Sequence, residues 1–349
     1  MTVGTESAPE VSSRRRLTGP GGWFLARGRA ALRVRELGLF VALIVIGIGM
    51  SIASPAFSSR QNLLTIGRNS SEVGIMALGM TIVLITGQVD LSVGALYATG
   101  GITAGIVMNH TGSPELSVAA ALGMAAAIGI ANGTLVGFLD LNSFMVTLGA
   151  LTIATGVLEL VTGGTSVALP QIGPKAAHLN DFLFLGKNLP SLGGINMEFV
   201  FFLALVVLLS RVLKYTKLGF QMYAVGGNRE AARIGGIRVP LIIVAAFIFS
   251  AVLAAFAGVL AMSFVGSMDP SSGTDLEFNV FAASVIGGAS LAGGRGTMFG
   301  TLLGALFLSV AQNGFILLGV SPFAQTVAVG VLIIIAIGID RWVSGGQRR

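Results

Sequence analysis

Cysteine is absent from this chain of 349 residues, and histidine occurs only twice. Without cysteine the chain has no disulfide, no thiolate metal ligand and no cysteine nucleophile. Charged residues make up 10% of the chain, against roughly 25% in an average soluble domain. So few charges could not cover the surface of a water-soluble fold. These shortages exclude the disulfide-rich secreted, disordered and ordinary soluble classes.

Apolar residues and glycine are abundant in this chain. Hydrophobic residues form 54% of the chain, and 50 residues are glycine. Glycine weakens a water-soluble helix, but inside a bilayer it lets helix backbones approach closely. We therefore predict an all-α polytopic membrane protein.

The length of the apolar runs predicts about ten transmembrane helices. A spanning helix needs about 20 mostly apolar residues. Runs that meet this requirement occur at 37–54, 70–87, 91–108, 116–137, 143–162, 197–213, 240–262, 278–291, 297–318 and 322–340.

Basic residues indicate the orientation, because cytoplasmic loops keep Lys and Arg. The connection 214–239 follows the sixth predicted span and carries five basic residues, whereas 109–115 and 263–277 carry none. This pattern predicts that both termini are cytoplasmic. The chain then divides into a basic cytoplasmic tail over 1–35, a transmembrane domain over 36–342 and a cytoplasmic C-terminal tail over 343–349.

Sequence motifs for catalysis are missing. The sequence has no G-x-x-x-x-G-K-[ST] phosphate loop, no G-x-S-x-G, no zinc motif and no dinucleotide fingerprint. By those routes the chain cannot itself hydrolyse ATP, and we predict no catalytic residue and no bound metal. Transport is the expected activity.

Two glycine-rich turns interrupt apolar runs. In the first, Asp90 and Ser92 lie between Gly87 and Gly94, and both are good caps for a following helix. The turn is either a capped connection between two spans or a broken helix that lines the solute path, where irregular backbone is tolerated. The second turn serves close packing or acts as a hinge, and an ion pair between Asp90 and Arg295 is a further hypothesis. It contains Gly287, Gly288, Gly293, Gly294, Arg295 and Gly296.

The loop 214–239 is longer than a bare turn needs. Residues 230–233 favour a short helix that Asn228 would cap and that Gly235-Gly236 would end. Such a helix on the cytoplasmic face would give a partner a rigid surface to push; the alternative is a merely solvated loop. The predicted docking residues are Gly226, Gly227, Asn228, Glu230, Ala231, Ala232 and Gly236.

Glu230-Ala231-Ala232 followed by Gly236 resembles the E-A-A loop by which permease subunits of bacterial ABC importers dock on their ATPase, without the downstream Leu-Pro. Three separated motifs resemble the ribose/xylose/arabinose-type sugar permeases more closely. They are G-G-x-D-L-S-V-G at 87–94, with Gln88 in place of the second glycine, A-x-G-G-N-x-x-A-A-x-x-x-G-I at 224–237, and V-I-G-G-x-x-x-x-G-G-x-G at 285–296. The resemblance runs from about residue 55 to 340.

This resemblance implies a multi-pass permease of the cytoplasmic (inner) membrane that imports a monosaccharide. The implied partners are an ATP-binding-cassette ATPase subunit, a second permease copy in a homodimer or heterodimer, and an extracytoplasmic sugar-binding protein. ATP and Mg would be held by the ATPase, so this chain itself needs no cofactor. No nucleic-acid partner is expected, despite the net charge of +6.

Polar residues within or beside the predicted spans are candidates for the translocation path. Besides Asp90 and Ser92, they are Asn69, Glu72, Asn142, Glu159, Asn279 and Asn313, with Asn132 and Gln312 nearby. The sequence leaves open a nucleoside, a furanosyl signal or a branched-chain amino acid as solute. It also leaves open an ion-coupled secondary transporter.

Overall fold

The computed structural model describes the backbone of residues 20–171 and 174–345, and the side chains over 36–171, 175–191, 193–335 and at 338. Its long helices are α1 (Pro20–Ala53), α2 (Arg60–Ile85), α3 (Val93–Thr111), α4 (Pro114–Gly137), α5 (Ser143–Thr162), α7 (Met197–Tyr215), α10 (Val239–Val265), α12 (Met298–Leu317) and α13 (Pro322–Gly345). The shorter helices are α6 (Leu179–Leu183), α8 (Lys217–Gly227), α9 (Arg229–Ile234) and α11 (Leu276–Ile286). Three 3-10 turns, at Pro174–Ala176, Phe184–Gly186 and Pro190–Leu192, complete the helical elements.

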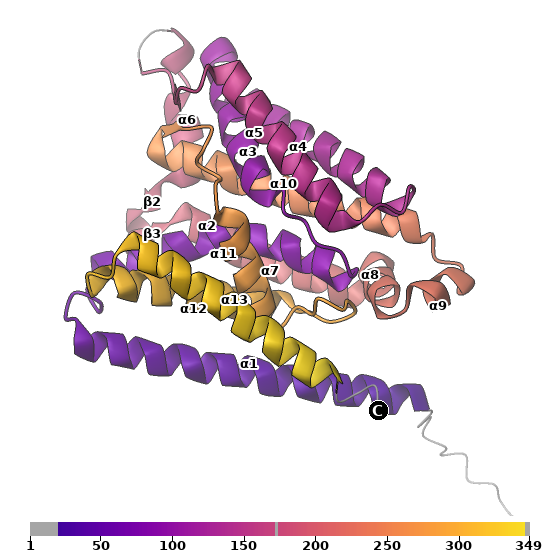
Figure 1. The fold of residues 1–349 in the computed structure, drawn as a ribbon. Helices are drawn as coiled ribbons and strands as arrows, with labels where there is room; N and C mark the ends of the chain where they lie inside the picture. The colour runs from indigo at the N-terminus through magenta and orange to yellow at the C-terminus, as the bar shows by residue number, and fades with distance from the viewer. Residues whose placement is uncertain (1–19, 172–173, 346–349) are drawn as a thin grey trace, which may run out of the picture.

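Four two-residue strands form two small antiparallel sheets. Strand β1 (Val167–Ala168) pairs with β4 (Ser267–Met268), with Val167 opposite Met268. Strand β2 (Asn188–Leu189) pairs with β3 (Ile195–Asn196), with Asn188 opposite Asn196. Figure 1 shows β2 and β3 at the end of the bundle opposite α8 and α9.

A helix occupies each of the ten predicted ranges, and the all-α class of a polytopic membrane protein is confirmed. Five described helices are long and apolar enough to cross a bilayer: α1 over Glu36–Ala53, α4, α5, α10 and α12. The full count of ten spans and the side on which each terminus lies stay predictions. Helix α1 begins at Pro20, so half of the predicted tail is helical, while 1–19 and 346–349 lie outside the described residues.

The prediction for 278–291 is wrong at its end. Helix α11 stops at Ile286, and residues 287–297 form a turn. With 11 residues, α11 is about 16 Å long, roughly half the thickness of a hydrocarbon core. The apolar run continues beyond the helix, because Ala289 and Leu291 follow Gly287 and Gly288. Composition alone therefore does not show where the helix ends. Figure 1 shows α11 lying across the middle of the bundle.

Side-chain caps explain where several helices start. Ser59, Ser113 and Asn142 precede α2, α4 and α5, and each side chain accepts a hydrogen bond from a backbone N–H of the first turn. At the other ends, Gly112, Gly163 and Gly266 follow α3, α5 and α10 in the left-handed conformation. Glycine adopts that conformation at no steric cost, which makes it a common helix terminator.

Helix α10 is the central element of the bundle and packs against α2, α3 and α4 (Figure 1). Its contact with α4 is made through Gly129, Gly133 and Gly137, which recur every four residues. A Cβ atom on Gly133 would lie 2.5 Å from Cα of Val244. This stripe is the close helix contact that the glycine content predicted.

We expect Gly133→Leu to destabilise the protein strongly, because the side chain has no space between α4 and α10. Overpacking typically costs about 1–3 kcal/mol or more. Gly123→Leu on the same helix is the matched control, since a Cβ there meets nothing within 4 Å. Thermal unfolding in detergent checks both variants, and equal midpoints would contradict the packing described.

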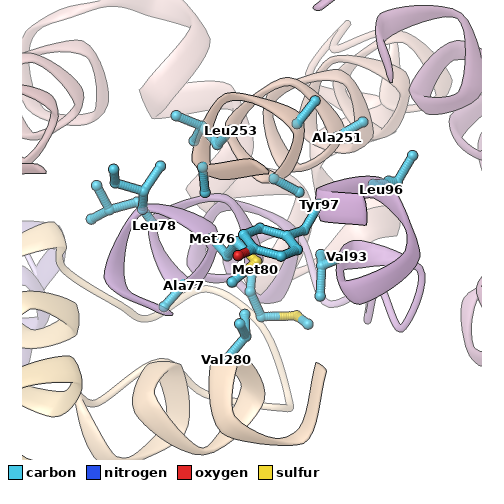
Figure 2. Close-up of a cluster of buried hydrophobic side chains, with 14 of the residues drawn as sticks. Met76, Ala77, Leu78, Met80, Val93, Leu96, Tyr97, Ala251, Leu253 and Val280 are labelled. Atoms are coloured by element: carbon cyan, nitrogen blue, oxygen red, sulfur yellow. The ribbon is translucent and has the colours of Figure 1, made fainter. Parts of the chain in front are cut away.

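The core lies where α2, α3, α10 and α11 meet, and Figure 2 shows it as a cluster of Met76, Met80, Leu96, Leu253 and Val280 around Tyr97. Helix α2 is enclosed by α7, α10, α11 and α12. Two of its buried polar side chains are satisfied within the helix, as Ser70 and Ser71 both donate to the carbonyl of Gly67. Helices α1 and α5 instead expose large apolar side chains such as Ile52 and Leu160, which suits contact with lipid.

Candidate functional site

Helices α8 and α9 form the segment predicted to dock a partner. Asn228 caps α9, its side chain accepting a hydrogen bond of 2.9 Å from the N–H of Ala231. The helix ends at Ile234, and Gly236 follows with φ of +81°. The short helix, its cap and its glycine terminator are therefore formed as the sequence indicates.

The surface of this segment is open to contact. Glu230 and Ala231 are exposed, while Ala232 is buried beneath them. Ile234 is 80% exposed and Phe220 of α8 is 70% exposed. Large apolar side chains exposed outside the spans indicate a surface that a protein partner covers.

A cleft of about 830 Å³ separates α9 from the turn between α4 and α5. Arg229, Arg233 and Arg238 line it together with Glu230. Arg229 Nη1 also forms an ion pair of 2.8 Å with Asp140 Oδ1 of that turn, which ties α9 to the bundle. The cleft therefore carries three arginines and two carboxylates, an excess of one positive charge.

The glycine-rich motifs converge at one point, which we call the glycine junction: Gly87, Gly226, Gly293 and Gly294. A Cβ atom on Gly226 of α8 would lie 1.8 Å from the carbonyl oxygen of Ile85 and 2.7 Å from N of Gly294. Gly294 N donates to that same Ile85 oxygen at 2.9 Å. The end of α2, the end of α8 and the turn 287–297 are thus in direct backbone contact.

Tyr223 adds a side-chain contact to the junction. Its hydroxyl donates to the carbonyl of Gly296 at 2.7 Å. Burial raises the pKa of Tyr223 to about 12, so the phenol keeps its proton, and with it the hydrogen bond, across the physiological range.

Helix α3 begins deep in the bundle. The hydroxyl of Tyr97, four residues into α3, donates to Glu72. Glu72 lies thirteen residues, about 20 Å of helix, before the end of α2. The start of α3 is therefore not level with the end of α2, and residues 86–92 return along α2 as irregular backbone (Figure 1).

Asp90 and Ser92 lie in this irregular stretch and are fully buried. Asp90 Oδ1 accepts from the Ser92 hydroxyl at 2.5 Å and from the Ser92 N–H at 3.0 Å. Ser92 stands at the predicted cap position, but its hydroxyl makes no capping hydrogen bond. Asn132 of α4 donates to Ser92 Oγ at 3.3 Å. Ser250 of α10 also lies beside the Asp90 carboxylate. The ion pair between Asp90 and Arg295 stays a prediction.

The other polar candidates lie apart from this group. Asn142 caps α5, Asn279 accepts from Gln312 at 2.9 Å, and Asn313 exchanges hydrogen bonds with Asn62. Asn69 accepts from Arg68 at 3.2 Å near Glu72.

The remaining glycines of the two motifs lie in backbone contacts or in the turn. Gly94 touches Gly273, and Gly287 touches Gly300 of α12. Gly288 adopts φ of +102° in the turn.

Glu159 lines a second cleft, which also holds Glu277, a residue that sequence reasoning missed. Glu277 lies one residue before the predicted span 278–291, within a stretch that the sequence predicts to be a loop. In the structure it belongs to the first turn of α11. Ser250 was missed as well, because one serine in an apolar run gives no signal. It lies beside the Asp90 carboxylate.

Comparison with known proteins identifies relatives over nearly the whole chain. Residues 62–337 match the family described as the permease component of branched-chain amino acid transport systems. The chain is 36% identical over 300 residues to the ribose import permease protein RbsC of Escherichia coli strain K12, covering 86% of this chain and 92% of that protein. It is 34% identical over 308 residues to the fructose import permease protein FrcC of Rhizobium meliloti, covering 87% and 84%. No solved structure matches.

Proposed function

The chain belongs to this family of transport-system permease components, and from that premise we propose that it is the membrane-spanning permease of an ABC importer for a ribose-like monosaccharide. The observation that carries the proposal is the exposed α8–α9 segment. Its residue Gly226 is in backbone contact with the end of α2 and with the turn 287–297. A chain without ATP-binding motifs needs such a segment to receive motion from a separate ATPase.

The ATPase subunit docks on α8 and α9. Glu230 and Ala231 present polar and small groups to it, and Ile234 and Phe220 present apolar ones. The cleft lined by Arg229, Arg233 and Arg238 favours an acidic partner surface. ATP and Mg bind to the partner, and this chain is not itself an enzyme.

Motion passes from the docking segment into the bundle through the glycine junction. A displacement of α8 acts at once on the end of α2 and on the turn 287–297, because no side chain separates them at Gly226. Packed elements transmit such displacements as rigid-body shifts. The turn leads back to α11, and the end of α2 leads through residues 86–92 to α3.

The assembly contains a second permease copy and an extracytoplasmic sugar-binding protein, in the cytoplasmic (inner) membrane. Both termini and the α8–α9 segment face the cytoplasm. Affinity for the solute resides in the binding protein, so the permease needs only weak contacts with it. The relatives named for ribose and fructose import support a monosaccharide over a nucleoside, a furanosyl signal or a branched-chain amino acid.

Uptake into proteoliposomes tests the proposal. The permease, assembled with its ATPase and binding protein, is expected to accumulate a labelled pentose only when ATP is supplied on the ATPase side. The permease alone, under a proton or sodium gradient, is the control. Uphill accumulation by the chain alone would favour the ion-coupled secondary transporter and overturn the proposal.

A further inference from the structure

A cleft of about 390 Å³ opens between α5 and the segment that leads into α11. One wall carries Thr152, Thr155 and Glu159 of α5. Their spacing of three and four residues places them on one face of the helix. The remainder of α5 is largely apolar, so this is a polar stripe on a hydrophobic helix.

The opposite wall carries Thr274 and Glu277. Glu277 is 8% exposed, and its Oε2 atom is buried without a hydrogen-bond partner among the described residues. A buried carboxylate oxygen without a partner is costly, and Glu277 combines this feature with a place in the wall of a cleft.

A glycine pair holds this wall in place. A Cβ atom on Gly273 would lie 1.9 Å from the carbonyl oxygen of Gly94, and one on Gly94 would lie 2.6 Å from Glu277 Oε2. The start of α11 can therefore rest against the start of α3 only because both residues lack a side chain. The contact fixes Glu277 between the first turn of α3 and the cleft.

The chemistry of the lining suits a neutral polyhydroxylated solute. Carboxylate oxygens accept hydrogen bonds from sugar hydroxyls, and threonine hydroxyls both donate and accept. Among the described lining residues none is Lys, Arg or His, so an anion such as a sugar phosphate or an amino-acid carboxylate has no counter-charge. The volume lies within the range of small-molecule sites, about 300–1,000 Å³.

We propose that this cleft is the place where a neutral monosaccharide contacts the chain during translocation, with Glu159 and Glu277 accepting hydrogen bonds from its hydroxyls. The inference rests on the proposed function and adds the residues that meet the solute. Glu159 and Thr152 are exposed, so the cleft surrounds the sugar only in part. Partial enclosure gives weak binding, as release requires.

Uptake by the complete transporter tests the two carboxylates. We expect Glu277→Gln and Glu159→Gln each to lower kcat/KM for a pentose about tenfold, the loss expected for one hydrogen bond to a charged acceptor. Each variant should also discriminate less between the pentose and its deoxy analogue. Glu198→Gln, a buried carboxylate outside the cleft, and Glu115→Gln, an exposed one, are the matched controls and should transport as the unmodified protein does.

Thiol labelling tests the cleft without relying on those variants. The chain has no cysteine, so Thr155→Cys creates a single target inside the cleft, and Thr165→Cys creates an exposed one outside it. Saturating pentose should slow labelling at position 155 severalfold and leave position 165 unchanged. Equal labelling with and without pentose, or protection by leucine instead, overturns the cleft assignment. Failure of the unmodified transporter to take up any monosaccharide overturns the proposed function itself.

Discussion

Replacing Glu230 with lysine is expected to abolish ATP-driven uptake while leaving the chain folded and inserted. Glu230 is exposed on α9, so its substitution disturbs no packing within the chain. If the ATPase covers this helix, the substitution removes the carboxylate that a partner group contacts and leaves that group facing an ammonium instead. A charged group left without its partner in a covered interface costs about 2–5 kcal/mol, enough to reduce uptake about 30-fold or more.

Two measurements separate this result from misfolding. The variant should unfold in detergent at the same temperature as the unmodified protein, and its co-purification with the ATPase should fall. Glu115→Lys, which makes the same charge change on an exposed residue in the first turn of α4, is the control and should retain uptake. Normal uptake with Glu230→Lys would count heavily against docking on α9.

The short helix α9 could be predicted in detail because its signals are local. Asn228, Glu230 and Gly236 lie within nine consecutive residues: Asn228 caps the first turn, Glu230 lies in that turn, and Gly236 follows the last turn. The presence of a helix in each range was predictable for a similar reason, since an apolar run of membrane length indicates a helix. Some boundaries were not, because α2 begins at Arg60, ten residues before the predicted 70, and α11 ends at Ile286.

The depth at which α3 and α11 begin could not be predicted from local signals. A turn between two apolar runs looks the same in sequence whether the second helix starts at the membrane surface or inside the bundle. The contact between Tyr97 and Glu72 settles the level of α3, and it joins residues on two helices. The hypothesis that 87–94 is a broken-helix segment therefore gains support from geometry that the sequence could not supply.

The contact between the glycine motifs could not be predicted from the sequence either. Gly87, Gly226 and Gly293 are separated by more than 60 residues from one another, and each alone is explained by a local turn or by packing. Their shared contact depends on the arrangement of α2, α8 and α11 in space. Glu277 could not be predicted for the same reason. Its inferred role depends on its contact with Gly94 and on its place in the cleft, and not on its neighbours in the chain.

Replacing Gly226 with alanine is expected to lower both uptake and stability. The new Cβ would lie 1.8 Å from the carbonyl oxygen of Ile85, so backbone must move rather than a flexible side chain. Opening the junction breaks the contact through which α8 acts on α2 and on the turn 287–297. We expect uptake to fall at least about tenfold, with a loss of stability of about 1–3 kcal/mol.

A glycine away from the junction provides the control. A Cβ on Gly123, inside α4, meets nothing within 4 Å, and alanine favours a helix over glycine by about 1 kcal/mol. Gly123→Ala should therefore leave uptake intact and raise the unfolding temperature slightly. Similar behaviour of the two alanine variants would show that the junction has no role in transport.

Should Gly226→Ala fail to fold, Tyr223→Phe tests the same junction without adding an atom. It removes the hydrogen bond to the Gly296 carbonyl, which costs about 0.5–1.5 kcal/mol, and keeps the aromatic ring in place. If α8 drives the turn 287–297, more ATP should be hydrolysed per sugar transported, while docking of the ATPase is unchanged. An unchanged ratio of hydrolysis to uptake would mean that the Tyr223 hydrogen bond does not carry the motion of α8 to the turn, because the variant leaves the backbone contact at Gly226 in place and removes only this bond.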